Sequence, residues 1–195
     1  NSDTAPGKMN EGILYQRKGD TEKSKAAYLQ ALKINNRFNN ARANLAQIYR
    51  SEGKFADAEK LYLKILEQEP YFGPGWNSLA LLYRDMEKYD KAIESFKVAI
   101  EKMPENILCY YFLADVYKKK NKIVDAAKAY AMGLSKFKGD QRSEVFLGTL
   151  KSLIELHIYM GNKETASQNL QYLIKIAGQR APYVKALMKQ VQRMQ

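Results

Sequence analysis

Few side chains in this chain have the chemistry that catalysis needs. His157 is the sole histidine and Cys109 the sole cysteine, whereas a catalytic nucleophile needs a base held beside it. His157 occupies the helical position at which Tyr83 and Tyr117 stand in equivalent segments, so we interpret it as a packing residue. Cys109 stands between two large apolar residues, and we interpret it as a small buried hydrophobe rather than a reactive thiol. The sequence therefore predicts a protein that is not an enzyme.

Metal, cofactor and phosphate sites are not indicated either. A single cysteine forms neither a thiolate-rich zinc site nor an intramolecular disulfide. The stretch 73–78, Gly-Pro-Gly-Trp-Asn-Ser, resembles a phosphate loop superficially, but no strand pattern precedes it and Ser78 stands where the third glycine should be. Acid pairs such as Glu67 and Glu69 fall in helix ends or turns, where solvated charge accounts for them. We expect no cofactor and no metal.

Composition and charge narrow the class of protein. The 195 residues are 46% hydrophobic, which is enough to bury a continuous core. No run approaches the roughly 18 consecutive apolar residues of a membrane-spanning helix, and no charged start followed by an apolar stretch marks a secretion signal. We expect a soluble protein of the cytoplasm or the periplasm. The net charge of +11 is concentrated in residues 107–142, which contribute +5, and residues 143–195, which contribute +4, and this favours an acidic partner.

An internal repeat organises the chain. Residues 39–72 superimpose on residues 73–106 without a gap, and these two equal segments define the repeat period. In the second segment Trp76, Leu79 and Tyr83 lie on one helical face, which must be buried. A short polar turn and a second helix follow, and small alanines let the two helices approach, so each segment is a helical hairpin. Matching residues recur in the neighbouring segments: Gly12, Tyr15, Ser24, Tyr28 and Ala31; Leu45, Ala46, Tyr49, Ala58, Tyr62, Ile65 and Pro70; and Tyr110, Leu113, Ala114, Tyr117, Ala126 and Tyr130.

These residues resemble the tetratricopeptide signature. The resemblance implies an all-α fold, a right-handed α-solenoid of helix hairpins with a C-terminal capping helix. Residues 138–142 interrupt the register, and the spacing to the next hairpin lengthens to about 40 residues. We expect one solenoid over residues 1–195, made of the repeats 5–38, 39–72, 73–106 and 107–140, a degenerate repeat at 147–180 and a capping helix at 182–194.

In tetratricopeptide proteins the first helix of each hairpin lines the inside of the superhelix, one residue beyond the core positions. The resemblance therefore implies a groove that binds a partner protein or an extended acidic peptide. Its lining, carried over position by position, is Asn10, Ile13, Asn40, Asn44, Gln47, Arg50, Asn77, Leu81, Arg84, Tyr111, Phe112, Asp115 and Lys118. Arg50, Arg84 and Lys118 stand one repeat period apart, so we expect them to form a cationic ladder. Exposed ion pairs contribute only about 0 to 1 kcal/mol each, so we expect apolar anchors such as Leu81 and Tyr111 to supply most of the affinity.

Three alternatives to this function are chaperone-tail binding, RNA binding and an origin as part of a larger assembly. The lysine, asparagine and arginine clamp with which some relatives hold chaperone tails is matched at one position in five, Asn44, so that mode is disfavoured. RNA binding is suggested by the net charge and the basic run 118–122, but no base-reading code is visible in the first helices. The third is an excised arm of a larger envelope or secretion assembly or of an enzyme, since stretch 44–53 is similar to repeat tails of bacterial envelope proteins. We also expect that homo-oligomers, if formed, use the solenoid ends, near Ile13.

Overall fold

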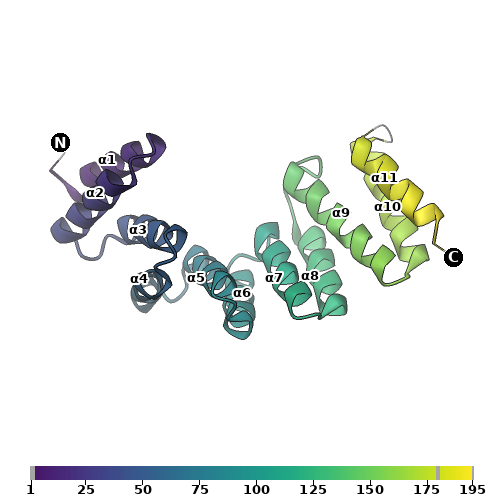
Figure 1. Ribbon diagram of the computed structural model, residues 1–195, viewed down its shortest axis with the longest axis horizontal. Coiled ribbons are helices and arrows are strands. Elements are labelled where there is room, and N and C mark those ends of the chain that lie inside the picture. The colour runs from purple at the N-terminus through teal and green to yellow at the C-terminus, as the bar shows by residue number, and fades with distance from the viewer. Residues whose placement is uncertain (1–2, 179–180, 195) are drawn as a thin grey trace. The chain divides into compact units, whose positions relative to one another are not determined.

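The structure is a computed structural model that describes residues 3–178 and 181–194, and every regular element in that part of the chain is an α-helix (Figure 1). The all-α fold of helix hairpins predicted from the sequence is confirmed. The chain divides into two compact units, Asn1–Lys102 and Met103–Gln195, which are described separately. The single solenoid and its repeat boundaries stay predictions, and the end of the degenerate repeat, residues 179 and 180, lies outside the described residues.

The described part of the first unit consists of three helix hairpins. They are α1 (Ala5–Arg17) with α2 (Thr21–Ile34), α3 (Asn39–Ser51) with α4 (Phe55–Gln68), and α5 (Gly73–Asp85) with α6 (Tyr89–Lys102). Successive hairpins are also in contact, because α2 packs against α3 and α4 packs against α5. Tyr28, Ala31, Leu45 and Ile48 form one buried cluster across the first of these junctions. Each hairpin therefore buries apolar surface that its neighbour would otherwise expose.

The described part of the second unit contains two hairpins and a final helix. They are α7 (Ile107–Lys119) with α8 (Ile123–Lys136), α9 (Glu144–Tyr159) with α10 (Lys163–Ala177), and α11 (Pro182–Gln192). Helix α11 packs against both α9 and α10. Its residues Val184, Leu187 and Val191 join Leu150 and Leu173 in one buried cluster. Helix α11 thus covers the apolar face of the last hairpin.

Each hairpin turns through one residue in the left-handed backbone conformation. These residues have φ between 57° and 78° and occupy equivalent positions: Gly19, Gly53, Glu87, Asn121 and Gly161. The residue that follows donates its backbone N–H to the carbonyl five residues earlier, as Lys88 does to Tyr83 at 2.8 Å. This bond satisfies a carbonyl at the end of the first helix. Glycine adopts such a φ at no steric cost, whereas Glu87 and Asn121 hold it under strain.

The loops between hairpins are closed by side-chain donors at equivalent positions of successive repeats. Trp76 donates from Nε1 to the backbone carbonyl of the residue six positions earlier at 2.8 Å, and Tyr110 donates from its hydroxyl in the same way at 3.0 Å. The guanidinium of Arg42 makes the corresponding bond in the preceding hairpin. Three different side chains serve here, because each brings a donor within reach of an otherwise unpaired carbonyl.

Candidate functional site

The thirteen side chains expected to line the binding groove all reach the surface of their own unit. None of them is buried: Asn10, Asn40, Gln47 and Lys118 are exposed, and the others are half-buried. Adjoining core positions such as Leu45 and Ala80 are buried, whereas Tyr49, Trp76 and Tyr117 are half-buried. The offset of one residue therefore separates surface from core at some positions only. That these side chains together bind a partner stays a prediction.

In the first unit, two of the expected cations share one carboxylate. The Nε of Arg50 on α3 lies 2.6 Å from Oδ2 of Asp85, and Nη2 of Arg84 lies 2.9 Å from Oδ1 of the same carboxylate. The cluster links two hairpins and combines two positive groups with one negative group. The sequence does not predict this role for Asp85, although its place directly after Arg84 is a usable signal. Lys118 lies in the second unit, so the alignment of all three cations stays a prediction.

Buried tyrosines stand at equivalent positions of three second helices: Tyr28 on α2, Tyr62 on α4 and Tyr130 on α8. The hydroxyl of Tyr28 donates to Oε1 of Gln16 on α1 at 3.0 Å. Burial raises the pKa of all three tyrosines, so their hydroxyls stay protonated at neutral pH. A neutral hydrogen bond therefore joins the two helices of the first hairpin.

Aromatic and acidic side chains line the corresponding face of the second unit. The ring centroid of Tyr111 on α7 lies 5.7 Å from that of Phe112 and 5.5 Å from that of Tyr130 on α8. Burial first, then the neighbouring Tyr111 and the carboxylates of Asp115 and Glu155, raise the pKa of Tyr130. Asp115 lies on α7 and Glu155 on α9, so carboxylates of two helices act on Tyr130. The rings of Tyr111 and Phe112 provide apolar contact area that the charged cluster of the first unit lacks.

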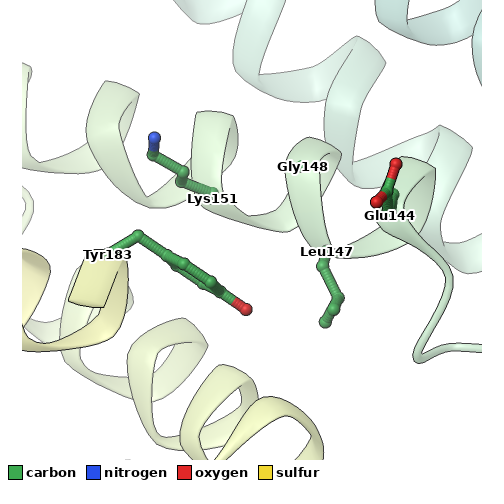
Figure 2. Close-up of a pocket in the computed structure, with 5 residues that line it drawn as sticks. All are labelled: Glu144, Leu147, Gly148, Lys151 and Tyr183. Carbon is green, nitrogen blue, oxygen red and sulfur yellow. The ribbon is translucent and has the colours of Figure 1, made fainter. Parts of the chain in front are cut away.

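A pocket of about 260 Å³ lies between α9 and α11 (Figure 2). We call it the Gly148 pocket. Its lining residues are Glu144, Leu147, Gly148, Lys151 and Tyr183. A second pocket, of about 510 Å³, lies along later turns of the same two helices, and its lining residues are Glu155, Ile158, Tyr159, Gln190 and Arg193. The Nζ of Lys151 lies 3.7 Å from Oε1 of Glu155.

The lining residues of α9 are not among those expected from the sequence. The inserted residues 138–142 shift the register, and the expected lining ends at Lys118. Beyond the insertion the same offset of one residue identifies two lining residues of these pockets, because Lys151 follows the buried Leu150 and Glu155 follows the buried Ile154. The pocket itself has no such signal, because it also depends on how α11 packs.

The single cysteine and histidine lie in packed surroundings. Burial raises the pKa of Cys109 to about 11, so the residue is a thiol at neutral pH. Burial lowers the pKa of His157, whose Nδ1 is buried and has no hydrogen-bond partner among the described residues. In the same part of the chain, no group of three or more potential metal ligands occurs. None of the described helices is long and apolar enough to cross a membrane.

Three family models match the chain, each with the description tetratricopeptide repeat. They cover residues 9–71, 61–94 and 83–144, and together they span residues 9–144 without a break. No curated protein matches the sequence. The resemblance drawn from the repeat pattern is confirmed by these matches.

Solved structures are similar over almost the whole chain. A crystal structure of the MamA protein has a TM-score of 0.74 at 20% identity, covering 94% of this chain and 97% of that one. The pilF protein of Pseudomonas aeruginosa has a TM-score of 0.71 at 15% identity, covering 97% and 83%. A MamA structure from Desulfovibrio magneticus RS-1 has a TM-score of 0.72 at 12% identity, covering 90% and 96%. At these identities the likeness establishes the fold alone.

Proposed function

Because the chain belongs to the tetratricopeptide-repeat family, whose fold implies protein partners, we propose that it is a non-catalytic scaffold for a partner with an extended acidic segment. The segment binds along the first-helix faces of the hairpins, over the lining residues described above. Amide side chains such as Asn44 and Asn77 pair with its backbone. Apolar residues, among them Leu81 and Tyr111, anchor its side chains.

The cluster of Arg50, Arg84 and Asp85 is the observation that carries this proposal. Guanidinium groups bind carboxylates through two parallel hydrogen bonds, so the cluster already holds the ligand type that we propose. A carboxylate of the partner competes with Asp85 for the two guanidinium groups. Residues 103–195 add 15 Lys+Arg against 7 Asp+Glu, a net charge of +8. This excess steers an acidic segment toward the chain and orients it.

The test begins with an unbiased selection of ligands. A random dodecapeptide library displayed on phage is selected on the purified chain, and the recovered peptides are synthesised with a fluorophore and titrated by anisotropy. We expect the recovered peptides to be enriched in Asp and Glu. Changing Arg50, Arg84 and Lys118 together to Glu should then weaken binding about tenfold or more, because attraction becomes repulsion at three positions.

A matched control separates the groove face from the overall charge. Lys33, Lys60 and Lys97 are exposed residues of second helices, and changing all three to Glu alters the net charge by the same amount. We expect this control to bind nearly as well as the unchanged chain at physiological salt, since distant charges are screened. An equal loss of affinity in both variants would contradict the assignment of the groove face.

Nucleic acid is the competing ligand class. Its test is a titration of labelled oligouridine at rising salt, because phosphate contacts make affinity fall steeply with ionic strength. Tight, salt-sensitive RNA binding together with no acidic peptides from the selection would replace the proposal. Buried tyrosines at repeat positions, such as Tyr28 and Tyr62, cannot stack on bases, which weighs against this outcome.

A further inference from the structure

Gly148 is a helical glycine whose missing side chain serves no packing purpose in the free chain. It lies in the second turn of α9 and is exposed. A Cβ added there would meet no atom within 4 Å beyond its chain neighbours and the backbone of its own helix. Glycine inside a helix lowers stability relative to alanine. The fold therefore carries a cost at this position without a steric gain.

Other glycines of the chain have an evident structural reason. A Cβ at Gly12 would lie 2.5 Å from Cε1 of Tyr28, so only glycine lets α1 and α2 approach. Gly19 has a φ of 78°, which suits glycine best. Gly148 lies in regular helix and has room beside it, so neither reason applies. What its missing side chain does provide is space in the Gly148 pocket.

The walls of the Gly148 pocket are apolar and held by the core. Figure 2 shows the side chains of Leu147 and Tyr183 directed into the space between α9 and α11, whereas the amino group of Lys151 and the carboxylate of Glu144 turn away from it. Leu147 and Tyr183 also pack on the buried cluster of this unit, so their positions are supported from behind. The volume of about 260 Å³ is below the roughly 300 to 1,000 Å³ of small-molecule sites, which favours a single side chain as the occupant.

The charge of α11, which forms one wall of the pocket, and of the whole unit indicates which kind of partner would supply this side chain. Helix α11 and the residue that caps it present three exposed cations: Lys185, Lys189 and Arg193. The unit as a whole has a net charge of +8. A second copy of the chain would bring further positive charge, while an acidic segment complements it.

We propose that the Gly148 pocket takes one leucine- or phenylalanine-sized side chain of the acidic partner segment, and that position 148 is glycine because any side chain there would fill the pocket. This inference rests on the proposed function, for which it supplies an apolar anchor. Charged residues of the segment orient it on the cationic surface, and the anchor adds affinity by leaving water for the contact with Leu147 and Tyr183.

A double-mutant cycle tests the proposal with the acidic peptides recovered in the selection above. In each peptide the apolar residues are replaced by serine one at a time, and each peptide is titrated against the unchanged chain and against Gly148→Leu. We expect one serine replacement to weaken binding about tenfold to a hundredfold. Gly148→Leu should cause a similar loss with the original peptide and almost no further loss with that serine peptide. The control Gln168→Leu adds the same side chain to an exposed site on α10 and should change nothing.

Each other outcome overturns the proposal in a recognisable way. Additive losses from Gly148→Leu and the serine replacement would show that the anchor binds elsewhere. Acidic peptides that lose no affinity with any serine replacement would leave the scaffold function intact and remove the anchor pocket. Recovery of no acidic peptide would overturn both proposals. Sedimentation velocity that detects dimers lost in Gly148→Leu would assign the pocket to a second copy instead. Melting temperatures confirm that Gly148→Leu stays folded.

Discussion

The two units present different side chains on the same kind of first-helix face. In the first unit, Arg50 and Arg84 are held by the carboxylate of Asp85. In the second, Tyr111 packs on Tyr130, and the apolar Gly148 pocket is open. The second unit is also more basic than the first. Residues 1–102 contain 17 Lys+Arg and 14 Asp+Glu, a net charge of +3, whereas residues 103–195 contain 15 Lys+Arg and 7 Asp+Glu, a net charge of +8.

The difference shows which positions of a hairpin the fold constrains and which it leaves open. Core and turn positions recur because every hairpin needs the same apolar seam and the same left-handed turn. The residue one step beyond the core bears no such requirement, so it varies from charged to aromatic without loss of the fold. On our proposal the charged positions orient an acidic segment and the apolar positions anchor it.

The largest expected effect is on the free energy of unfolding when leucine replaces one glycine in each unit. Gly12→Leu in the first unit should lower the free energy of unfolding by about 3 kcal/mol, because the new side chain collides with the ring of Tyr28. Gly148→Leu in the second unit should raise it by up to about 1 kcal/mol, because helix propensity improves and no clash arises. Urea unfolding followed by circular dichroism measures both. Equal destabilisation would mean that the space beside Gly148 is filled in solution.

The next effect concerns binding of the selected acidic peptides. Asp85→Asn removes the internal competitor of the two guanidinium groups, so affinity should rise severalfold at low salt and less at high salt. Asp140→Asn, at an exposed acid between α8 and α9, alters the charge equally and should have a smaller effect. Anisotropy titrations at two salt concentrations decide between them. A fall in affinity for Asp85→Asn would mean that Asp85 holds the arginines in their binding geometry.

A smaller effect on stability is expected at the two hairpin turns whose left-handed residue is not glycine. Glu87→Gly should raise the free energy of unfolding by about 1 kcal/mol, because a left-handed φ of 58° is costly for a side chain with a Cβ. Asn121→Gly, at a φ of 57°, should gain about half as much, since asparagine tolerates this conformation better. Thermal and urea unfolding measure the gains. A loss of stability in both variants would contradict the strain assigned to these turns.

The smallest effect is a pH dependence at one residue of the second unit. Burial depresses the pKa of His157 in the folded chain below the value of about 6.5 that it has when unfolded. The unfolded chain therefore binds the proton first, and stability from this residue should fall as pH drops below about 6.5. His157→Tyr, which restores the residue found at Tyr83 and Tyr117, should remove this part of the dependence. Unfolding curves between pH 5 and 7 for both chains test it, and identical pH dependence would contradict it.

Much of the fold follows from sequence patterns that act within one hairpin. The spacing of Trp76, Leu79 and Tyr83 predicts a helical face, and the recurrence of that pattern along the chain predicts stacked hairpins, which the eleven helices of the described residues confirm. The turns were only partly predictable. Gly19 and Gly53 mark a left-handed residue by their type, but Glu87 does not, because there the rest of the hairpin imposes the conformation.

By itself the sequence determined the helices, their pairing and the residues that reach the surface, because helical periodicity is a local property and every side chain on one face shares one environment. Tertiary packing alone decided that Asp85 joins Arg50 across two hairpins and that Leu147 faces Tyr183 beside Gly148. Each of those contacts connects residues that lie more than a full hairpin apart in the sequence. They depend on how closely successive helices approach, a distance set by the whole buried seam rather than by any single spacing.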